Sequence, residues 1–287
     1  MQEKIHLRKF DKSDSFLKLA SIYCTLAIFC VISIYPILNI ISISLRPSTS
    51  AFLDSLDLIP QNATLSNYFF VFKKYPVLQW IKNSFLASVV STIVGVSISI
   101  SAGYAFSRFR FRGRRLGLMM VFLTKMFPAT MMLLPLYLML IFIGLNNTFT
   151  GLIIIYISKS IPFNVWIMKG YFDTIPRALE ESAYIDGASV WKTFYKIILP
   201  LAKPAIALAS IFSFMMSWSE YIVARTVLTE SEKITLPVGL VNMQGEWSTD
   251  WGMYSTAALV TTIPVVIIFV MLSKYLVGGL SAGGVKE

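Results

Sequence analysis

The sequence has little charge, one histidine and two cysteines, and each scarcity excludes a class of protein. Only 14% of its 287 residues are charged, whereas soluble domains carry about 25%. Disorder is excluded as well, because 14% of the residues are aromatic. Cys24 and Cys30 lie in one apolar run and form no disulfide framework. With His6 as its one histidine, the chain offers no Cys/His cluster for a metal, and we expect no resident cofactor.

Hydrophobic residues make up 56% of the chain and gather in long runs. A transmembrane helix needs about 20 mostly apolar residues. Six runs meet this requirement, at residues 19–45, 83–107, 116–143, 149–168, 205–224 and 253–277. The sequence therefore predicts an all-α, polytopic membrane protein with six transmembrane helices. Its expected parts are an N-terminal segment 1–18, a transmembrane domain 19–277 that includes a long loop 169–204, and a C-terminal tail 278–287.

The basic residues lie in short blocks between these runs, which is the pattern that orients a membrane protein. If the N-terminus is inside, the inner segments hold 17 Lys and Arg and the outer segments hold 6. Arg108 to Arg115 is the strongest block and is typical of a cytoplasmic stop-transfer turn. The net charge of +10 therefore predicts orientation, with both termini in the cytoplasm, and indicates no nucleic-acid partner.

The loop 169–204 is too apolar for a solvated linker. Pro176 suits the start of a helix, and a pair of glutamates in its first turns complements the helix dipole. Gly187 can end that helix with a backbone conformation that other residues avoid. From Val190 to Ile198 the apolar residues recur at helical spacing, which predicts a second helix with one apolar face. Spacing alone leaves two uses open, an element lying on the membrane interface and a docking surface for a soluble partner.

The residues of this loop resemble a known motif. Glu181-Ser182-Ala183, Gly187 and Ile197-x-Leu199-Pro200 reproduce the EAA–x3–G–x9–I–x–LP pattern of binding-protein-dependent ABC importer permeases, with Ser182 where alanine is usual. Three further stretches resemble the MalG-type carbohydrate permeases of that family: Gly103 to Phe109, the pair Phe127-Pro128 with Leu134 to Tyr137, and Tyr275 to Lys286.

The resemblance implies a type I ABC importer permease fold and a place in the bacterial cytoplasmic membrane. It implies that the loop is a coupling helix that docks on an ATPase subunit, where Glu181 pairs with a basic residue. The other residues expected at this contact are Ser182, Ala183, Gly187, Ile197, Leu199 and Pro200. The tail residues Gly283, Gly284 and Lys286 are expected to reach toward the ATPase. The chain has no Gly-Lys dipeptide and hence no phosphate loop of its own, so ATP and Mg²⁺ belong to the partner.

Further partners follow from the same resemblance. They are a second, MalF-like permease subunit in a heterodimer, two nucleotide-binding ATPase subunits, an extracytoplasmic sugar-binding protein, membrane lipid, and an oligosaccharide substrate of the malto- or galacto-type. Two lysines inside apolar runs, Lys125 and Lys159, leave an acidic oligosaccharide open as well. An ion-coupled secondary transporter is the alternative, but it would need an internal repeat that the two halves of the sequence do not show. A membrane-embedded enzyme would need clustered histidines or acids, which are also missing.

Charged residues inside apolar runs are functional candidates. Lys125 and Lys159 lie deep in their runs, and Glu220 lies near the outer end of its run between Trp218 and Tyr221. We take these five as candidates for the substrate pathway, where a cation would favour an acidic substrate. The alternatives are snorkelling to the interface or pairing with a backbone carbonyl for the lysines, and an interfacial aromatic belt for Trp218 and Tyr221.

The outer loop before the last run is rich in aromatic and acidic residues. By the resemblance it would touch the binding protein, and the alternative is a loop packed on the spans. The candidates are Glu246, Trp247, Asp250 and Trp251.

The charge asymmetry makes a testable prediction about topology. Reporter fusions placed after Lys9 and after Val285 should both report a cytoplasmic location, because the basic blocks favour the inner side of the membrane. One fusion scoring outside would overturn the six-span arrangement.

Overall fold

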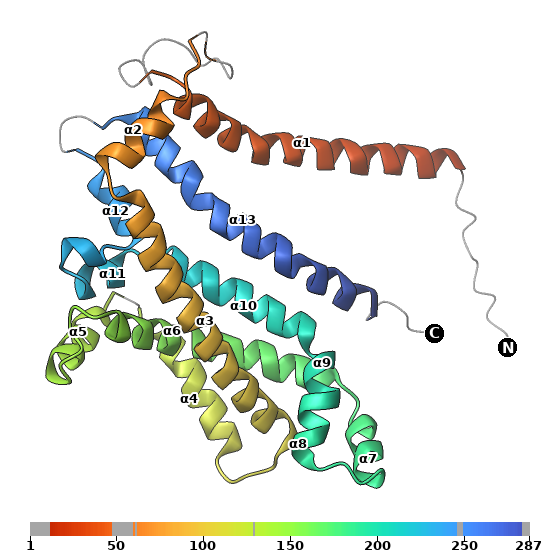
Figure 1. Ribbon diagram of the computed structural model, residues 1–287. Coiled ribbons are helices and arrows are strands. Elements are labelled where there is room, and N and C mark those ends of the chain that lie inside the picture. The colour runs from red at the N-terminus through yellow and green to blue at the C-terminus, as the bar shows by residue number, and fades with distance from the viewer. Residues whose placement is uncertain (1–11, 48–59, 61, 129, 246–248, 283–287) are drawn as a thin grey trace. The chain divides into compact units, whose positions relative to one another are not determined.

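The computed structural model describes the chain except for residues 1–11, 48–59, 61, 129, 246–248 and 283–287. Within the described part every regular element is a helix, so the all-α prediction is confirmed (Figure 1). The elements are α1 (Lys12–Ser44), α2 (Ser66–Lys74), α3 (Val77–Arg108), α4 (Arg114–Met126), α5 (Leu133–Phe142), α6 (Phe149–Thr174), α7 (Ala178–Ile185), α8 (Val190–Thr193), the π-helical turn η1 (Phe194–Ile198), α9 (Leu199–Leu201), α10 (Lys203–Trp218), α11 (Ile222–Val227), the 3-10 turn η2 (Ser231–Lys233), α12 (Leu236–Asn242) and α13 (Trp251–Ala282).

The chain divides into two compact units. The first comprises Met1–Val71 with Asp250–Leu259, and the second comprises Phe72–Thr249 with Val260–Glu287. In the first unit the buried side chain of Asn67 donates to the carbonyl oxygens of Ser44 and Arg46, at 2.9 and 2.7 Å. These bonds satisfy carbonyls that the end of α1 leaves without helical partners.

Among the residues that the structure describes, four helices are long and apolar enough to cross a membrane. They are α1 from Lys18 onward, α3, α6 and α13 up to Tyr275. The fifth run forms α10, which follows Val190–Leu201 at a bend of 71°. Six spans remain consistent with this arrangement, although they are not six uniform helices.

The third predicted span is not one continuous helix, which corrects the sequence interpretation. Residues 116–143 contribute to α4 and α5, and the described residues between Met126 and Leu133 are not helical. Pro128 explains the break, because proline has no N–H and pushes the residue before it out of the helical conformation. Phe127 accordingly has φ −75° and ψ 128°, an extended backbone.

Helices α3 and α6 form the centre of the second unit, with α10 beside them (Figure 1). Small residues allow α3 and α6 to approach closely: a Cβ added to Gly103 would lie 2.7 Å from the Cβ of Met168 and 3.0 Å from the backbone nitrogen of Lys169. Polar side chains also join the helices. Asn164 donates to Ser213 at 2.7 Å, and the hydroxyls of Ser91 and Ser217 lie 3.1 Å apart. Close packing and interhelical hydrogen bonds are what hold helices together in lipid.

Two glycines therefore predict opposite effects of the same substitution. Gly103→Ala should destabilise the protein by about 1–3 kcal/mol, since the added methyl group overpacks the crossing of α3 and α6. Gly170, also within α6, has no atom within 4 Å of an added Cβ, and it serves as the control. Gly170→Ala should stabilise by about 0.5–1 kcal/mol through its effect on helix propensity. Thermal unfolding in detergent would measure both, and equal shifts would contradict the close approach.

Candidate functional site

The loop carrying the EAA-like motif is a compact helical segment. We call residues Pro176 to Pro200 the coupling segment. Its first helix, α7, ends at Ile185, and the chain turns at Gly187, whose φ of +78° lies in the left-handed region that favours glycine. The amide of Gly187 donates to Tyr184 O at 3.0 Å, and that of Ala188 donates to Ala183 O at 2.9 Å. The reversed chain then enters α8, where the hydroxyl of Ser189 accepts from Lys192 N.

The second half of the coupling segment buries only part of its predicted apolar face within this chain. Phe194 and Ile198 are buried, whereas Trp191 and Tyr195 are exposed by 71% and 59%. The two exposed residues and the two buried residues each have i, i+4 spacing and therefore lie on adjacent strips of the helix. A π-helical turn, η1, lies within this stretch, where the amide of Leu199 donates to the carbonyl of Phe194, five residues earlier. The two exposed rings stack on each other, with centroids 6.1 Å apart.

A buried ion pair fastens the coupling segment to the end of α3. The Arg108 Nε atom lies 2.8 Å from the Glu180 Oε1 atom, and the two side chains are only 7% and 8% exposed. The same guanidinium donates through Nη2 to the carbonyl oxygen of Ile175 at 2.9 Å. Arg108 and Glu180 therefore attach the coupling segment to α3, in addition to the roles that the sequence indicates for them in membrane topology and at the helix dipole.

Neighbouring polar groups extend this attachment to α6. The Ser107 hydroxyl donates to Asp173 Oδ1 at 2.6 Å, and Asp173 also pairs with Lys169 on the previous turn. Arg177 Nη2 donates to the backbone oxygen of Ser107 at 3.3 Å. We call Ser107, Arg108, Asp173, Arg177 and Glu180 the polar clamp. It joins the ends of α3 and α6 to the start of the coupling segment.

The residues of the EAA-like motif differ in exposure from the buried Arg108–Glu180 pair. Glu181, Ser182 and Pro200 are exposed, Ile197 and Leu199 are half-buried, and Ala183 is buried. Glu180 faces inward while Glu181, the next residue, is solvent-accessible. The carboxylate of Glu181 is thus free to meet another chain, and its neighbour holds the helix in place.

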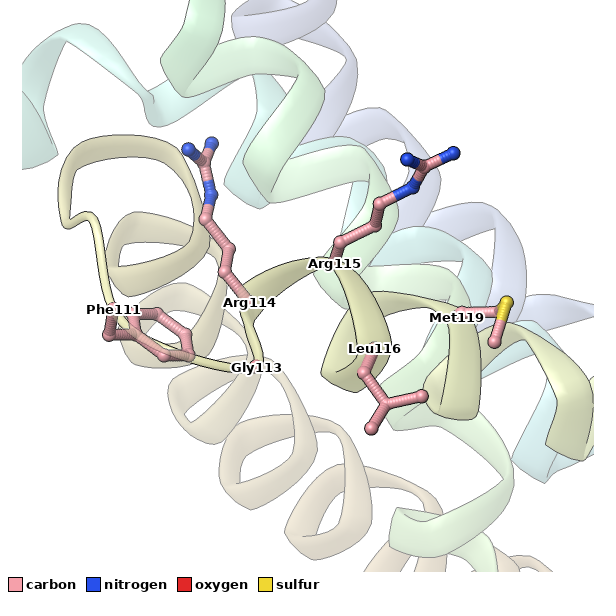
Figure 2. Close-up of a pocket in the computed structure, with 6 residues that line it drawn as sticks. All are labelled: Phe111, Gly113, Arg114, Arg115, Leu116 and Met119. Atoms are coloured by element: carbon pink, nitrogen blue, oxygen red, sulfur yellow. The ribbon is translucent and has the colours of Figure 1, made fainter.

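The basic turn between α3 and α4 forms the rim of a surface depression of about 700 Å³. Arg114 and Arg115 project from the first turn of α4 on the side away from Leu116, as Figure 2 shows. Arg114 Nε donates to the carbonyl oxygen of Phe106 at 2.8 Å, which folds the turn back on the end of α3. The remaining lining residues are Phe111, Gly113 and Met119.

The structure brings together the three charged candidates for the substrate pathway. Lys125 Nζ donates to the carbonyl oxygen of Lys159 at 2.6 Å, and the Lys159 ammonium forms an ion pair with Glu220. The other oxygen of Glu220 accepts from Val223 N at 3.2 Å. Trp218 is buried and stacks on Phe214, and Tyr221 packs against the cluster around Leu140 and Leu152. Sequence analysis named these charges separately and missed the ion pair.

The remaining candidates lie at the edges of the described chain. Glu246 and Trp247, like the tail residues Gly283, Gly284 and Lys286, fall outside the described residues. Asp250 Oδ1 accepts from Met253 N at 3.0 Å and so caps α13, and the ring of Trp251 meets that of Tyr254 at 5.8 Å. Among the described residues, no three His, Cys, Asp or Glu side chains gather as metal ligands would.

Comparison with known proteins decides the family. A family model described as binding-protein-dependent transport system inner membrane component matches residues 95–281. The chain belongs to this family. It is therefore a multi-pass inner-membrane permease component of an ABC importer that works with a binding protein, and it is not the ATPase.

The relatives of this permease span nearly its whole length. It is 38% identical to the galactooligosaccharides transport system permease protein GanQ of Bacillus subtilis, covering 94% of this chain and 96% of GanQ. It is 35% identical to the maltose/maltodextrin permease protein MalG of Vibrio parahaemolyticus, with coverage of 86% and 88%. A solved bacterial ABC transporter that imports the acidic polysaccharide alginate contains a chain that superposes with a TM-score of 0.78 at 26% identity, covering 93% and 99%.

The polar clamp predicts that breaking one salt bridge of this permease costs more stability than breaking another. Arg108→Ala leaves the Glu180 carboxylate buried without its partner and should cost about 3–5 kcal/mol of stability. Lys169→Ala removes one partner of a more exposed pair, where the side chains are 23% and 42% exposed, and should cost less than about 1 kcal/mol. Thermal unfolding in detergent compares the two.

The double variant Arg108→Met/Glu180→Met provides the internal control. It removes both charges and should recover most of the stability lost in Arg108→Ala. Equal losses in Arg108→Ala and Lys169→Ala would contradict the clamp.

Proposed function

We propose that this permease is one of two membrane subunits of an ATP-driven importer for oligosaccharides. A second, MalF-like permease completes the heterodimer, and two ATPase subunits bind ATP and Mg²⁺ and drive the cycle. An extracytoplasmic sugar-binding protein delivers an oligosaccharide of the malto- or galacto-type or an acidic one. The transport roles of GanQ and MalG support a sugar substrate, and the alginate importer shows that the same fold serves an acidic one.

The observation that carries this proposal is that the coupling segment is exposed and is attached to α3 by a buried ion pair. An ATPase can move a transmembrane domain only through a part of the permease that is both accessible and firmly attached. Glu181 and the stacked rings of Trp191 and Tyr195 are accessible, and the Arg108–Glu180 pair attaches them to α3. Phe194 and Ile198 lie in the same core cluster as Met168 and Phe172 of α6, so a push on the segment reaches two long helices.

The charges of α7 favour a protein partner over the membrane interface. Glu181 and Asp186 are exposed on α7 and at its end. Anionic lipid would repel these two carboxylates, whereas it would attract the exposed Lys192 and Lys196 of the second half. A protein surface with a basic residue opposite Glu181 can instead form a charge-assisted pair with it, which gives both attraction and a fixed register.

Two substitutions in the coupling segment should uncouple transport without affecting membrane insertion. Glu181→Lys replaces attraction to a cationic partner group by repulsion. Gly187→Val places a branched side chain at a φ of +78°, which strains the turn and redirects α8. Oligosaccharide uptake should collapse in both, and the ATPase should either dissociate or stop responding to the loaded binding protein.

The measurements are recovery of the ATPase with the affinity-purified permease, and hydrolysis stimulated by the loaded binding protein in nanodiscs. Glu232→Lys is the matched control, because Glu232 is also exposed but lies in η2, in the predicted outer segment 225–252. It should behave as wild type. Normal assembly together with normal stimulated hydrolysis and uptake in both coupling variants would refute the proposed coupling role.

A further inference from the structure

Three charges and two helix breaks coincide in the membrane-spanning part of the second unit. Lys125 is the penultimate residue of α4, directly before the break between Met126 and Leu133. Glu220 lies in the break between α10, which ends at Trp218, and α11, which begins at Ile222. Lys159 of α6 bridges the two sites, because its backbone oxygen accepts from Lys125 and its ammonium pairs with Glu220.

A break in a helix within a membrane indicates what surrounds the backbone at that point. Backbone that leaves its helix at this depth loses hydrogen bonds that lipid cannot replace, so it occurs only where protein buries it or where it lines a water-filled path. Transporters place such breaks at the path that the substrate follows. Here both breaks carry a charged residue at or next to them, and charges within spans mark the same paths.

The net charge of this cluster is positive. Lys159 and Glu220 neutralise each other, whereas Lys125 donates to a carbonyl oxygen and is exposed on the surface of the chain. Lys125 follows Arg114, at the basic turn, by eleven residues, which corresponds to about 16 Å along a helix. At that depth the ammonium is far from the headgroups of that side, so a polar surrounding is favoured over hydrocarbon.

We propose that Lys125 recognises an anionic group of the transported oligosaccharide, a carboxylate of a uronic-acid unit. This inference rests on the proposed import function and selects the acidic substrate class among those left open. The Lys159–Glu220 ion pair is the positioning element: it fixes α6 against the α10–α11 break and thereby fixes the carbonyl that orients the Lys125 ammonium. The fold does not decide the substrate charge, since relatives with this fold import neutral and acidic sugars alike.

Uptake by the intact importer, reconstituted with its own binding protein in proteoliposomes, tests the substrate class. The two probes are a tetrauronate and maltotetraose, which match in length and differ in charge. Wild type should import the tetrauronate. Lys125→Gln should lower that uptake by about tenfold or more, the loss expected for one charge-assisted hydrogen bond, and Lys125→Arg should retain most of it. Lys274→Gln is the control, because Lys274 lies over the ring of Tyr275 near the end of α13.

Cysteine accessibility tests the location of Lys125 independently of the substrate class. In a Cys24→Ala/Cys30→Ala background, Lys125→Cys should react with a water-soluble, charged thiol reagent, and the tetrauronate with its binding protein should slow the reaction. Leu123→Cys is the control, since it lies two residues earlier and about 200° around the same helix. It should show no protection by the substrate.

The outcomes separate this inference from the import function. Wild-type import of maltotetraose but not of the tetrauronate would overturn the acidic class and leave the import function intact. Loss of the second permease from purified Lys125→Gln complexes, with unchanged uptake per assembled complex, would place Lys125 at the subunit interface and overturn its role in recognition. Uptake of neither sugar, with no stimulated hydrolysis by any loaded binding protein, would instead contradict the import function itself.

Discussion

The ion pair between Arg108 and Glu180 is the constraint on which the rest of the mechanism depends. Both groups are nearly buried, and their mutual charge and the carbonyl of Ile175 satisfy them. A pair in this position is costly to break, because separation leaves an unpaired charge out of water. It therefore fixes where the coupling segment begins relative to α3, and the exposure of Glu181 follows from the burial of its neighbour.

The two functional regions of the permease are connected by continuous helices. Helix α6 carries Asp173 of the polar clamp at one end and Lys159 fourteen residues earlier, about 21 Å along the axis. Helix α10 runs from the end of the coupling segment toward Glu220. Because Lys159 and Glu220 pair, the helices that leave the coupling segment meet again at the charged cluster. Movement imposed on the segment is thus transmitted to the proposed recognition site by helices rather than by loops.

Local patterns in the sequence predict the local features well. The apolar runs predict the helical membrane protein, and the spacing of Glu181, Gly187 and Pro200 predicts the helix–turn–helix segment, with Gly187 at positive φ. Both depend on residues close in the chain. The break at Pro128 was also visible as a proline, but the length of the run suggested a single span, and only the backbone geometry shows that α4 ends before it.

The pairings could not be predicted in the same way. Arg108 and Glu180 are 72 residues apart in the sequence. Arg108 is explained locally as part of a stop-transfer turn, and Glu180 as an acidic residue that complements the helix dipole, so neither residue points to the other. Lys159 and Glu220 were both noticed, but nothing in their spacing indicates that they meet. The π-helical turn at Phe194 likewise has no signature in apolar periodicity.

The central claim is that the coupling segment and α3 move as one body during the ATPase cycle. Spin labels on Ser97 of α3 and Ile185 of α7, both exposed, measure this distance directly in the cysteine-free importer. Double electron–electron resonance should give the same distance distribution without nucleotide and with ATP trapped, in samples whose stimulated hydrolysis is intact. A distribution that shifts between the two states would show that the segment moves independently of α3 and would contradict the account.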